Sequence, residues 1–187
     1  MTTILNLKPL IQLNSENFYQ LCQNNPDSLL ELSKNGELII VSPVGGESGN
    51  RETNLTADLI IWNHQTQLGV VFSSSTIFNL PKGGNRSPDV AWVSLARWEK
   101  LTPAEKEGFP PLCPDFVIEL RSKSDRLQPL QDKMLEYLAS GLRLGWLINL
   151  QQQQVEIYRA NQPAEIVAMP THLSGEDILP NLNLLLV

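Results

Sequence analysis

Two carboxylates stand at the ends of predicted strands in the middle of the chain. Asp89 follows Pro88 at the start of one apolar run, and Glu119 lies near the end of another, 30 residues further on. Two carboxylates, with a backbone carbonyl and water, suit Mg²⁺, which takes few protein ligands and keeps much of its water. Such an ion polarises a phosphoryl oxygen and lowers the pKa of a bound water. One interpretation of the residues is therefore a hard-cation site at Asp89 and Glu119, with Mg²⁺ as the ion and Mn²⁺ as its substitute.

Basic residues near Glu119 allow a second interpretation of the same segment. With a side-chain period of two, a strand that continues far enough places Glu119, Arg121 and Lys123 on one face. Lys133 follows in a predicted helix, and it is either a partner of Glu119 or an ordinary exposed lysine. A Glu inside an apolar strand is costly to bury unpaired. Glu119 therefore either forms a structural ion pair with Arg121 or Lys133, or it belongs to a metal site.

A third acid belongs to the long helix predicted from about Asn50 to Thr66. One stripe of that helix, with members three, seven and ten positions after the first, consists of Glu52, Leu55, Leu59 and Trp62. A carboxylate thus begins the stripe that should face the core. The alternative is an acid that only benefits from the dipole at the helix N-terminus.

The elements that must position these residues are a mixture of strands and helices. Strands are predicted at residues 37–42, 69–72, 76–78, 87–93, 115–121, 144–149, 155–159 and 166–169. Helices are predicted at 15–23, at 50–66 and around 129–139, with short helical turns within 96–108 and loops at 43–49 and 81–86. Because a helix stands between strands at two places, we expect an α/β (mixed α+β) fold with a sheet flanked by helices.

Length and charge constrain the class of protein. The 187 residues suit one domain, which we place at 1–187. The net charge of −6 argues against a nucleic-acid coat protein, because such proteins are usually strongly basic. The charge is uneven: residues 82–133 hold nine basic and eight acidic residues, a balance of +1, and the remaining residues carry −7. The segment with the candidate site is therefore close to neutral.

Several other chemistries lack the spacing that they need. Cys22 and Cys113 form no zinc motif or disulfide framework, and His64 and His172 are isolated from each other. The run at residues 73–75, three serines, has no nucleophile-elbow spacing. No apolar run could span a membrane, and the first residues lack the features of a signal peptide. We therefore expect a cytoplasmic protein with no membrane partner.

The spacing of Pro88-Asp89 and Glu119-Leu120-Arg121 resembles the bipartite signature of the PD-(D/E)XK restriction-endonuclease-like nucleases. A larger part of the chain, roughly residues 35 to 160, resembles one bacterial member of that superfamily, the putative restriction endonuclease family. The segments that carry this resemblance are Ser42–Gly49, Arg86–Asp89, Pro114–Asp125, Lys133–Tyr137, Gly141 and Gly145–Asn149.

The resemblance implies a restriction-endonuclease-like mixed sheet with helices on its faces. It also implies Mg²⁺-dependent hydrolysis of DNA phosphodiester bonds. It assigns Asp89 and Glu119 as metal ligands and Leu120 as the donor of a backbone carbonyl. Arg121 departs from the superfamily pattern, because it stands where a Lys is usual. An Arg stays protonated and cannot act as a base, although it can hold a phosphate.

Two further roles follow from the resemblance. Lys133, one helical turn before Tyr137, is a candidate for a relocated lysine, and Lys123 is a weaker one. Many members of the superfamily also use an acid from the first long helix. Glu52 fits by its inward face and Glu47 by the Gly-Gly-Glu stretch, and we favour Glu52.

Two functions remain open at this point. The first is a Mg²⁺-dependent DNA endonuclease. The second is a catalytically silent nuclease-fold protein that acts as a binding or regulatory module, which the Arg at position 121 and the acidic remainder of the chain would suit. A homodimer would suit cleavage of both strands, and residues 184–187 are a candidate pairing surface. The favoured alternative is that this tail packs on its own chain.

Overall fold

The computed structural model describes residues 2–186, and its largest sheet has six strands in the order β11-β10-β9-β8-β7-β4. Their bounds are β4 Gly69–Ser73, β7 Val90–Ser94, β8 Phe116–Leu120, β9 Leu144–Asn149, β10 Gln154–Arg159 and β11 Glu165–Ala168. Strands β8 and β9 are parallel, and the other neighbours are antiparallel. The mixed α+β fold class predicted from the sequence is confirmed.

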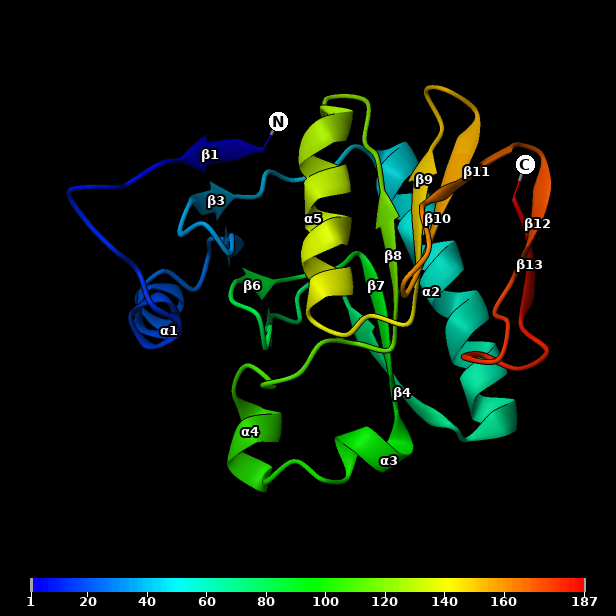
Figure 1. The fold of residues 1–187 in the computed structure, drawn as a ribbon, viewed down its shortest axis with the longest axis horizontal. Helices are drawn as coiled ribbons and strands as arrows, with labels where there is room; N and C mark the ends of the chain where they lie inside the picture. Colours follow the sequence, from blue (N-terminus) through cyan, green and yellow to red (C-terminus); the bar gives the residue numbers. More distant parts are fainter. Residues whose placement is uncertain (1, 187) are drawn as a thin grey trace.

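Two helices, α2 (Gly46–Thr66) and α5 (Leu127–Ala139), cover opposite faces of this sheet (Figure 1). Successive side chains of a strand point to opposite faces, and β8 shows this clearly. Ile118 packs in the same cluster as Leu59 of α2, whereas Val117 packs in the same cluster as Tyr137 of α5. Glu119 follows the direction of Val117, so its side chain is directed toward α5.

Both helices begin earlier than the sequence indicates. The segment 43–49 was expected to be a loop because of its glycines, which are poor helix formers. In the structure α2 starts at Gly46, and the N–H of Gly49 donates to the carbonyl of Gly45 at 3.1 Å. Helix α5 starts at Leu127, so Pro129 lies in its first turn, where backbone N–H groups have no helical partner.

A second sheet, in the order β1-β3-β2-β6-β5, lies to the left of α5 in Figure 1. Its strands are β1 Thr3–Leu5, β2 Leu30–Leu32, β3 Leu38–Ile40, β5 Phe78–Asn79 and β6 Asn85–Arg86. Helix α1 (Ser15–Asn24) packs Phe18 against Leu30 and Leu32. The sequence pattern did not predict β2, and it predicted a turn where β6 lies, because both strands are only two or three residues long. This sheet places residues 31 and 86 beside α5.

The remaining elements are short. Helices α3 (Leu95–Trp98) and α4 (Pro103–Glu107) lie in the region where short helical turns were expected. Strands β12 (Thr171–Ser174) and β13 (Asn183–Leu186) form an antiparallel pair, and Leu184 is buried in the cluster on the α2 side. Packing of the tail on its own chain is thus confirmed for residues 183–186; Val187 lies outside the described residues. Within residues 2–186, no helix is long and apolar enough to cross a membrane.

Candidate active site

The antiparallel pairing of β7 and β8 brings the two predicted acids together. Val90 is paired with Ile118, so Asp89, directly before β7, lies beside Glu119. Oδ2 of Asp89 accepts a hydrogen bond of 2.6 Å from the backbone N–H of Leu120. Residues that are 30 positions apart in the chain therefore meet at one point, where one strand starts and its neighbour ends.

Glu119 is buried, with 2% of its surface exposed, and α5 supplies its partners. Nζ of Lys133 lies 2.9 Å from Oε1 and 3.1 Å from Oε2 of Glu119. The hydroxyl of Tyr137 donates to Oε1 at 3.0 Å. Lys133 and Tyr137 are one helical turn apart, so both reach the same carboxylate. Of the two basic partners considered from the sequence, Lys133 is the one that pairs with Glu119.

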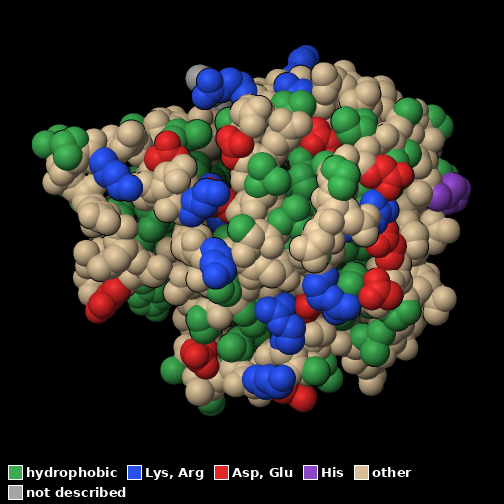
Figure 2. All heavy atoms as spheres, viewed as in Figure 1, with side chains coloured by type: hydrophobic (Ala, Val, Ile, Leu, Met, Phe, Trp, Pro, Cys, Tyr) green, Lys and Arg blue, Asp and Glu red, His purple; other side chains and the backbone are tan. Residues whose placement is uncertain are grey.

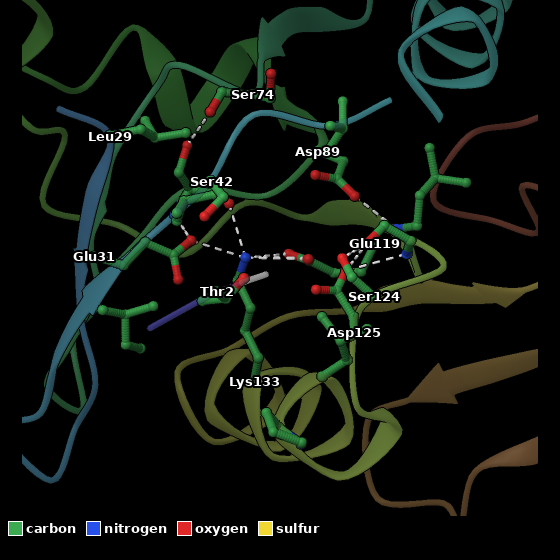
Figure 3. Close-up of a pocket in the computed structure, with 18 of the residues that line it drawn as sticks. Thr2, Leu29, Glu31, Ser42, Ser74, Asp89, Glu119, Ser124, Asp125 and Lys133 are labelled. Atoms are coloured by element: carbon green, nitrogen blue, oxygen red, sulfur yellow. Dashed lines mark hydrogen bonds and ion pairs between the residues drawn. The ribbon is translucent and has the colours of Figure 1, made fainter. Parts of the chain in front are cut away.

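The ammonium group of Lys133 also contacts two groups outside the six-stranded sheet. It donates to the carbonyl oxygen of Ser87 at 2.9 Å and lies 2.8 Å from Oε1 of Glu31 (Figure 3). The same carboxylate of Glu31 accepts the N–H of Ser87 at 2.9 Å and Nη1 of Arg86 at 3.0 Å. Nε of Arg86 in turn donates to Oε2 of Glu136 at 2.7 Å. A continuous network of buried charges thus joins β2, β6 and α5 to Glu119.

Glu31 and Arg86 were not predicted as site residues. The signal for Glu31 was present, because a lone Glu between Leu30 and Leu32 is an acid within an apolar triplet. A triplet is too short to establish a strand period, and its neighbours gave no reason to place it near Asp89. Arg86 was assigned to a turn, although it is 5% exposed in the structure.

The carboxylates of the site share unfavourable surroundings for negative charge. Burial raises the pKa of Asp89 well above its ordinary value, and the nearby charges of Glu119 and Glu52 raise it further. Burial also raises the pKa of Glu119, an effect that Lys133 only partly offsets. For Lys133 burial acts to lower the pKa, but the carboxylates of Glu119 and Glu31 outweigh it, so its pKa is raised. Lys133 is therefore an ammonium ion at neutral pH.

A cavity of about 1230 Å³ opens over this cluster. Its charged lining includes Asp89, Glu119 and Lys133 in the centre of the close-up in Figure 3. Apolar side chains on or next to the second sheet (β1-β3-β2-β6-β5), called the N-terminal sheet below, also line the cavity, namely Ile4, Leu29, Ile39, Val41 and Val44. Basic side chains in the lining, besides Arg86 and Lys133, are Lys34, Lys123 and Arg126. On the face seen in Figure 2, basic and acidic side chains are interspersed.

The two candidate acids of α2 both line the cavity but differ in exposure. Glu52 is half-buried, and its charge acts on Asp89. Glu47 lies in the first turn of α2 with 92% of its side chain exposed, and it forms an ion pair of 3.6 Å with Arg51. Glu52 is therefore the acid of α2 whose charge reaches the cluster.

Arg121 lies away from the cluster. Strand β8 ends at Leu120, so the alternation that would bring Arg121 to the face of Glu119 does not continue. Its Nε donates to the carbonyl of Asp125 at 3.1 Å and its Nη1 to Oδ1 of Asn149 at 3.2 Å. Within the described part of the chain, the lining of the cavity does not include Arg121, whereas it does include the exposed Lys123.

Comparisons with known proteins agree with this architecture. The model of the Uma2 family, described as "Putative restriction endonuclease", matches residues 15–187. The structure is similar to that of a putative nuclease belonging to DUF820 from Anabaena variabilis, with a TM-score of 0.71 and 19% identity over 83% of this chain and 86% of that chain. At this identity the likeness shows the fold, so the predicted restriction-endonuclease-like architecture is confirmed. No curated protein matches the chain. Because the family model covers nearly all of the sequence, the chain belongs to the Uma2 family of putative restriction endonucleases.

Proposed function

We propose that this protein is a metal-dependent nuclease that hydrolyses phosphodiester bonds of DNA in the cavity over β7, β8 and α5. The observation that carries the proposal is the meeting of Asp89 and Glu119 with the ammonium group of Lys133 at the floor of that cavity. Membership of a family described as restriction endonucleases supports a nuclease-like function.

Asp89 and Glu119 are the residues that would hold the metal ion, with the backbone carbonyl of Leu120 as the further candidate ligand. The donors fit a hard cation, because two neighbouring carboxylates with raised pKa values are relieved by positive charge between them. Among residues 2–186 there is no group of three or more His, Cys, Asp or Glu that could hold a metal ion. Mg²⁺ or Mn²⁺ needs only one or two carboxylates beside water and phosphate oxygens. When bound, it would polarise the scissile phosphate and activate a water.

Lys133 contributes fixed positive charge in this proposal. Because its pKa is raised, it holds its proton and does not act as a general base. Its three N–H donors are taken by Ser87, Glu31 and Glu119, so it would act on the negative charge that develops on the phosphate through its charge alone. Glu52, on α2, would orient the attacking water. Water adds to phosphorus, the bond to one ester oxygen breaks, and that oxygen leaves with a proton.

The direct test is incubation of the purified protein with supercoiled plasmid and with single-stranded DNA, each with Mg²⁺, with Mn²⁺ and with EDTA. We expect cleavage that needs the metal ion. The absence of cleavage of any substrate with either ion would overturn the proposal.

One observation favours the silent binding module as a second candidate. Both oxygens of Glu119 accept hydrogen bonds, Oε2 from Lys133 and Oε1 from Tyr137. A protein that had lost catalysis could keep this network for stability alone. Calorimetry with Mn²⁺ separates the two functions: a nuclease should bind the ion and lose that binding on Glu119→Gln, whereas a silent module should bind DNA without a metal ion and without cleavage.

Replacement of Arg121 by Ala should leave the rate of cleavage within about twofold of the wild type, because Arg121 does not line the cavity. The loss of its hydrogen bonds to Asp125 and Asn149 should lower the free energy of unfolding by about 1 kcal/mol. Initial rates of plasmid nicking and urea denaturation measure the two effects. A loss of more than about tenfold in rate at unchanged stability would instead show that Arg121 takes part in catalysis.

Glu52 and Glu47 offer a matched pair of acids on one helix. Glu52→Gln should lower the rate of cleavage by about tenfold, because it removes a charge that acts on Asp89 and, in our proposal, on the attacking water. Glu47→Gln should change the rate by less than about twofold, since its side chain is 92% exposed. Equal effects of the two substitutions on the initial rate would contradict the assignment of Glu52.

A further inference from the structure

We propose that Glu31 is a positioning residue of this site, which shares the ammonium group of Lys133 with Glu119 and so leaves more of the negative charge of Glu119 available to a metal ion. The inference rests on the proposed function and adds to it a residue of the N-terminal sheet. Glu31 lies in β2, which belongs to a different sheet from the strands that carry Asp89 and Glu119.

The ammonium group of Lys133 contacts three different residues. A lysine ammonium has three N–H donors, and here its acceptors are the carbonyl of Ser87 at 2.9 Å, Oε1 of Glu31 at 2.8 Å and the carboxylate of Glu119, whose two oxygens lie at 2.9 and 3.1 Å. Two of the three partners are anions, and they come from opposite sides, as Figure 3 shows for Glu31 and Glu119. The positive charge of Lys133 is therefore shared between the two carboxylates.

The position of Glu31 is itself held by other groups. Its Oε1 accepts the N–H of Ser87 at 2.9 Å and its Oε2 lies 3.0 Å from Nη1 of Arg86. Arg86 is fixed from the other side by Glu136 at 2.7 Å. Glu31 is 3% exposed, so water does not compete with these contacts. The carboxylate is thus a preformed anchor for Lys133, with its second oxygen occupied by Arg86.

This arrangement has a consequence for metal binding. A cation entering between Asp89 and Glu119 competes with Lys133 for the carboxylate of Glu119. With Gln at position 31, Glu119 is the only anion left in contact with Lys133, so the ammonium binds it more strongly and a metal ion displaces it less easily. Groups that orient a metal ligand without touching the ion typically account for about 10- to 100-fold in metal affinity or activity. We therefore expect Glu31→Gln to weaken Mn²⁺ binding by about tenfold.

Glu136→Gln is the matched control. Glu136 binds the same Arg86, is also buried at 4% exposure, and forms no ion pair with Lys133 in the described part of the chain. Each substitution removes one negative charge from Arg86, and Glu31→Gln also removes an anion from Lys133, so both should lower the thermal unfolding midpoint, Glu31→Gln by more. Only Glu31→Gln should weaken Mn²⁺ binding, measured by isothermal titration calorimetry on the full chain, and Glu136→Gln should stay within about twofold of the wild type.

A double-variant cycle separates positioning from simple loss of charge. If Glu31 acts through Lys133, then adding Glu31→Gln to Lys133→Met should change the Mn²⁺ affinity by less than about twofold, although Glu31→Gln alone changes it about tenfold. The double variant removes one charge of each sign, so it should be at least as stable as Lys133→Met. Should Lys133→Met fail to fold, the Mn²⁺ affinities of Glu31→Gln and Glu136→Gln are sufficient to test the role of Glu31.

The results that overturn the inference are distinct from those that overturn the nuclease. Equal Mn²⁺ affinities of wild type and Glu31→Gln, or a tenfold loss that persists in the Lys133→Met background, would refute the role of Glu31 while a cleaving wild type keeps its function. A wild-type protein that neither binds Mn²⁺ nor cleaves DNA overturns both. A loss specific to Glu31→Gln that vanishes in the Lys133→Met background supports the inference.

Discussion

Replacement of Asp89 by Asn is expected to lower the rate of metal-dependent DNA cleavage by about a thousandfold. An amide has nearly the shape of the carboxylate and can still accept the N–H of Leu120, but it carries no charge to hold a cation beside Glu119. A catalytic metal ion stabilises the transition state by several kcal/mol, and each 1.36 kcal/mol corresponds to a factor of about ten. Initial rates of plasmid nicking at saturating Mn²⁺ measure the loss.

Asp89→Asn should not lower the stability of the folded protein. The raised pKa of Asp89 means that its ionised form is disfavoured in the folded protein, so at neutral pH its removal should leave the free energy of unfolding equal or higher. Asp132→Asn serves as the control, because Asp132 is an exposed acid in the lining of the same cavity and should keep the rate within about twofold. An Asp89→Asn protein as active as this control would exclude Asp89 from catalysis.

Replacement of Lys133 by Met should produce the largest loss of stability, about 3–5 kcal/mol in the free energy of unfolding. The substitution leaves the carboxylates of Glu31 and Glu119 buried without the ion that lies 2.8 Å from one and 2.9 Å from the other. Cleavage should fall by about 10²- to 10³-fold, because the substitution removes a fixed positive charge near the developing negative charge. Urea denaturation and initial nicking rates measure the two effects.

The stability loss should depend on pH in a definite direction. Burial already raises the pKa of Glu119, and Lys133 is the main influence that lowers it. Without Lys133 this pKa rises further, so the folded state loses stability as pH rises and recovers it as the carboxyl takes up its proton. Adding Glu119→Gln to Lys133→Met should therefore restore part of the stability but none of the activity. A Lys133→Met protein with wild-type stability at neutral pH would contradict the buried ion pair.

Local patterns were sufficient for the elements that carry the predicted acids. The apolar runs around Asp89 and Glu119 gave two strands, and the spacing of apolar residues around Lys133 gave a helix, each within a few residues of its observed bounds. The start of α2 was predicted four residues too late, because glycine has a low intrinsic helix propensity, whereas Gly46 and Gly49 belong to the first turn of the helix. The resemblance to the putative restriction endonuclease family also includes segments of these elements, namely Arg86–Asp89, Pro114–Asp125 and Lys133–Tyr137.

What the amino-acid sequence determined by itself was therefore the elements that carry Asp89, Glu119 and Lys133, since these depend on neighbours in the chain. Only the tertiary structure decided which charges meet. The register of β7 against β8 places Asp89 beside Glu119, and the end of β8 at Leu120 leaves Arg121 outside the cluster. The three-residue strand β2 inserts Glu31 against Lys133 across more than a hundred positions, a contact that depends on long-range packing and not on any local period.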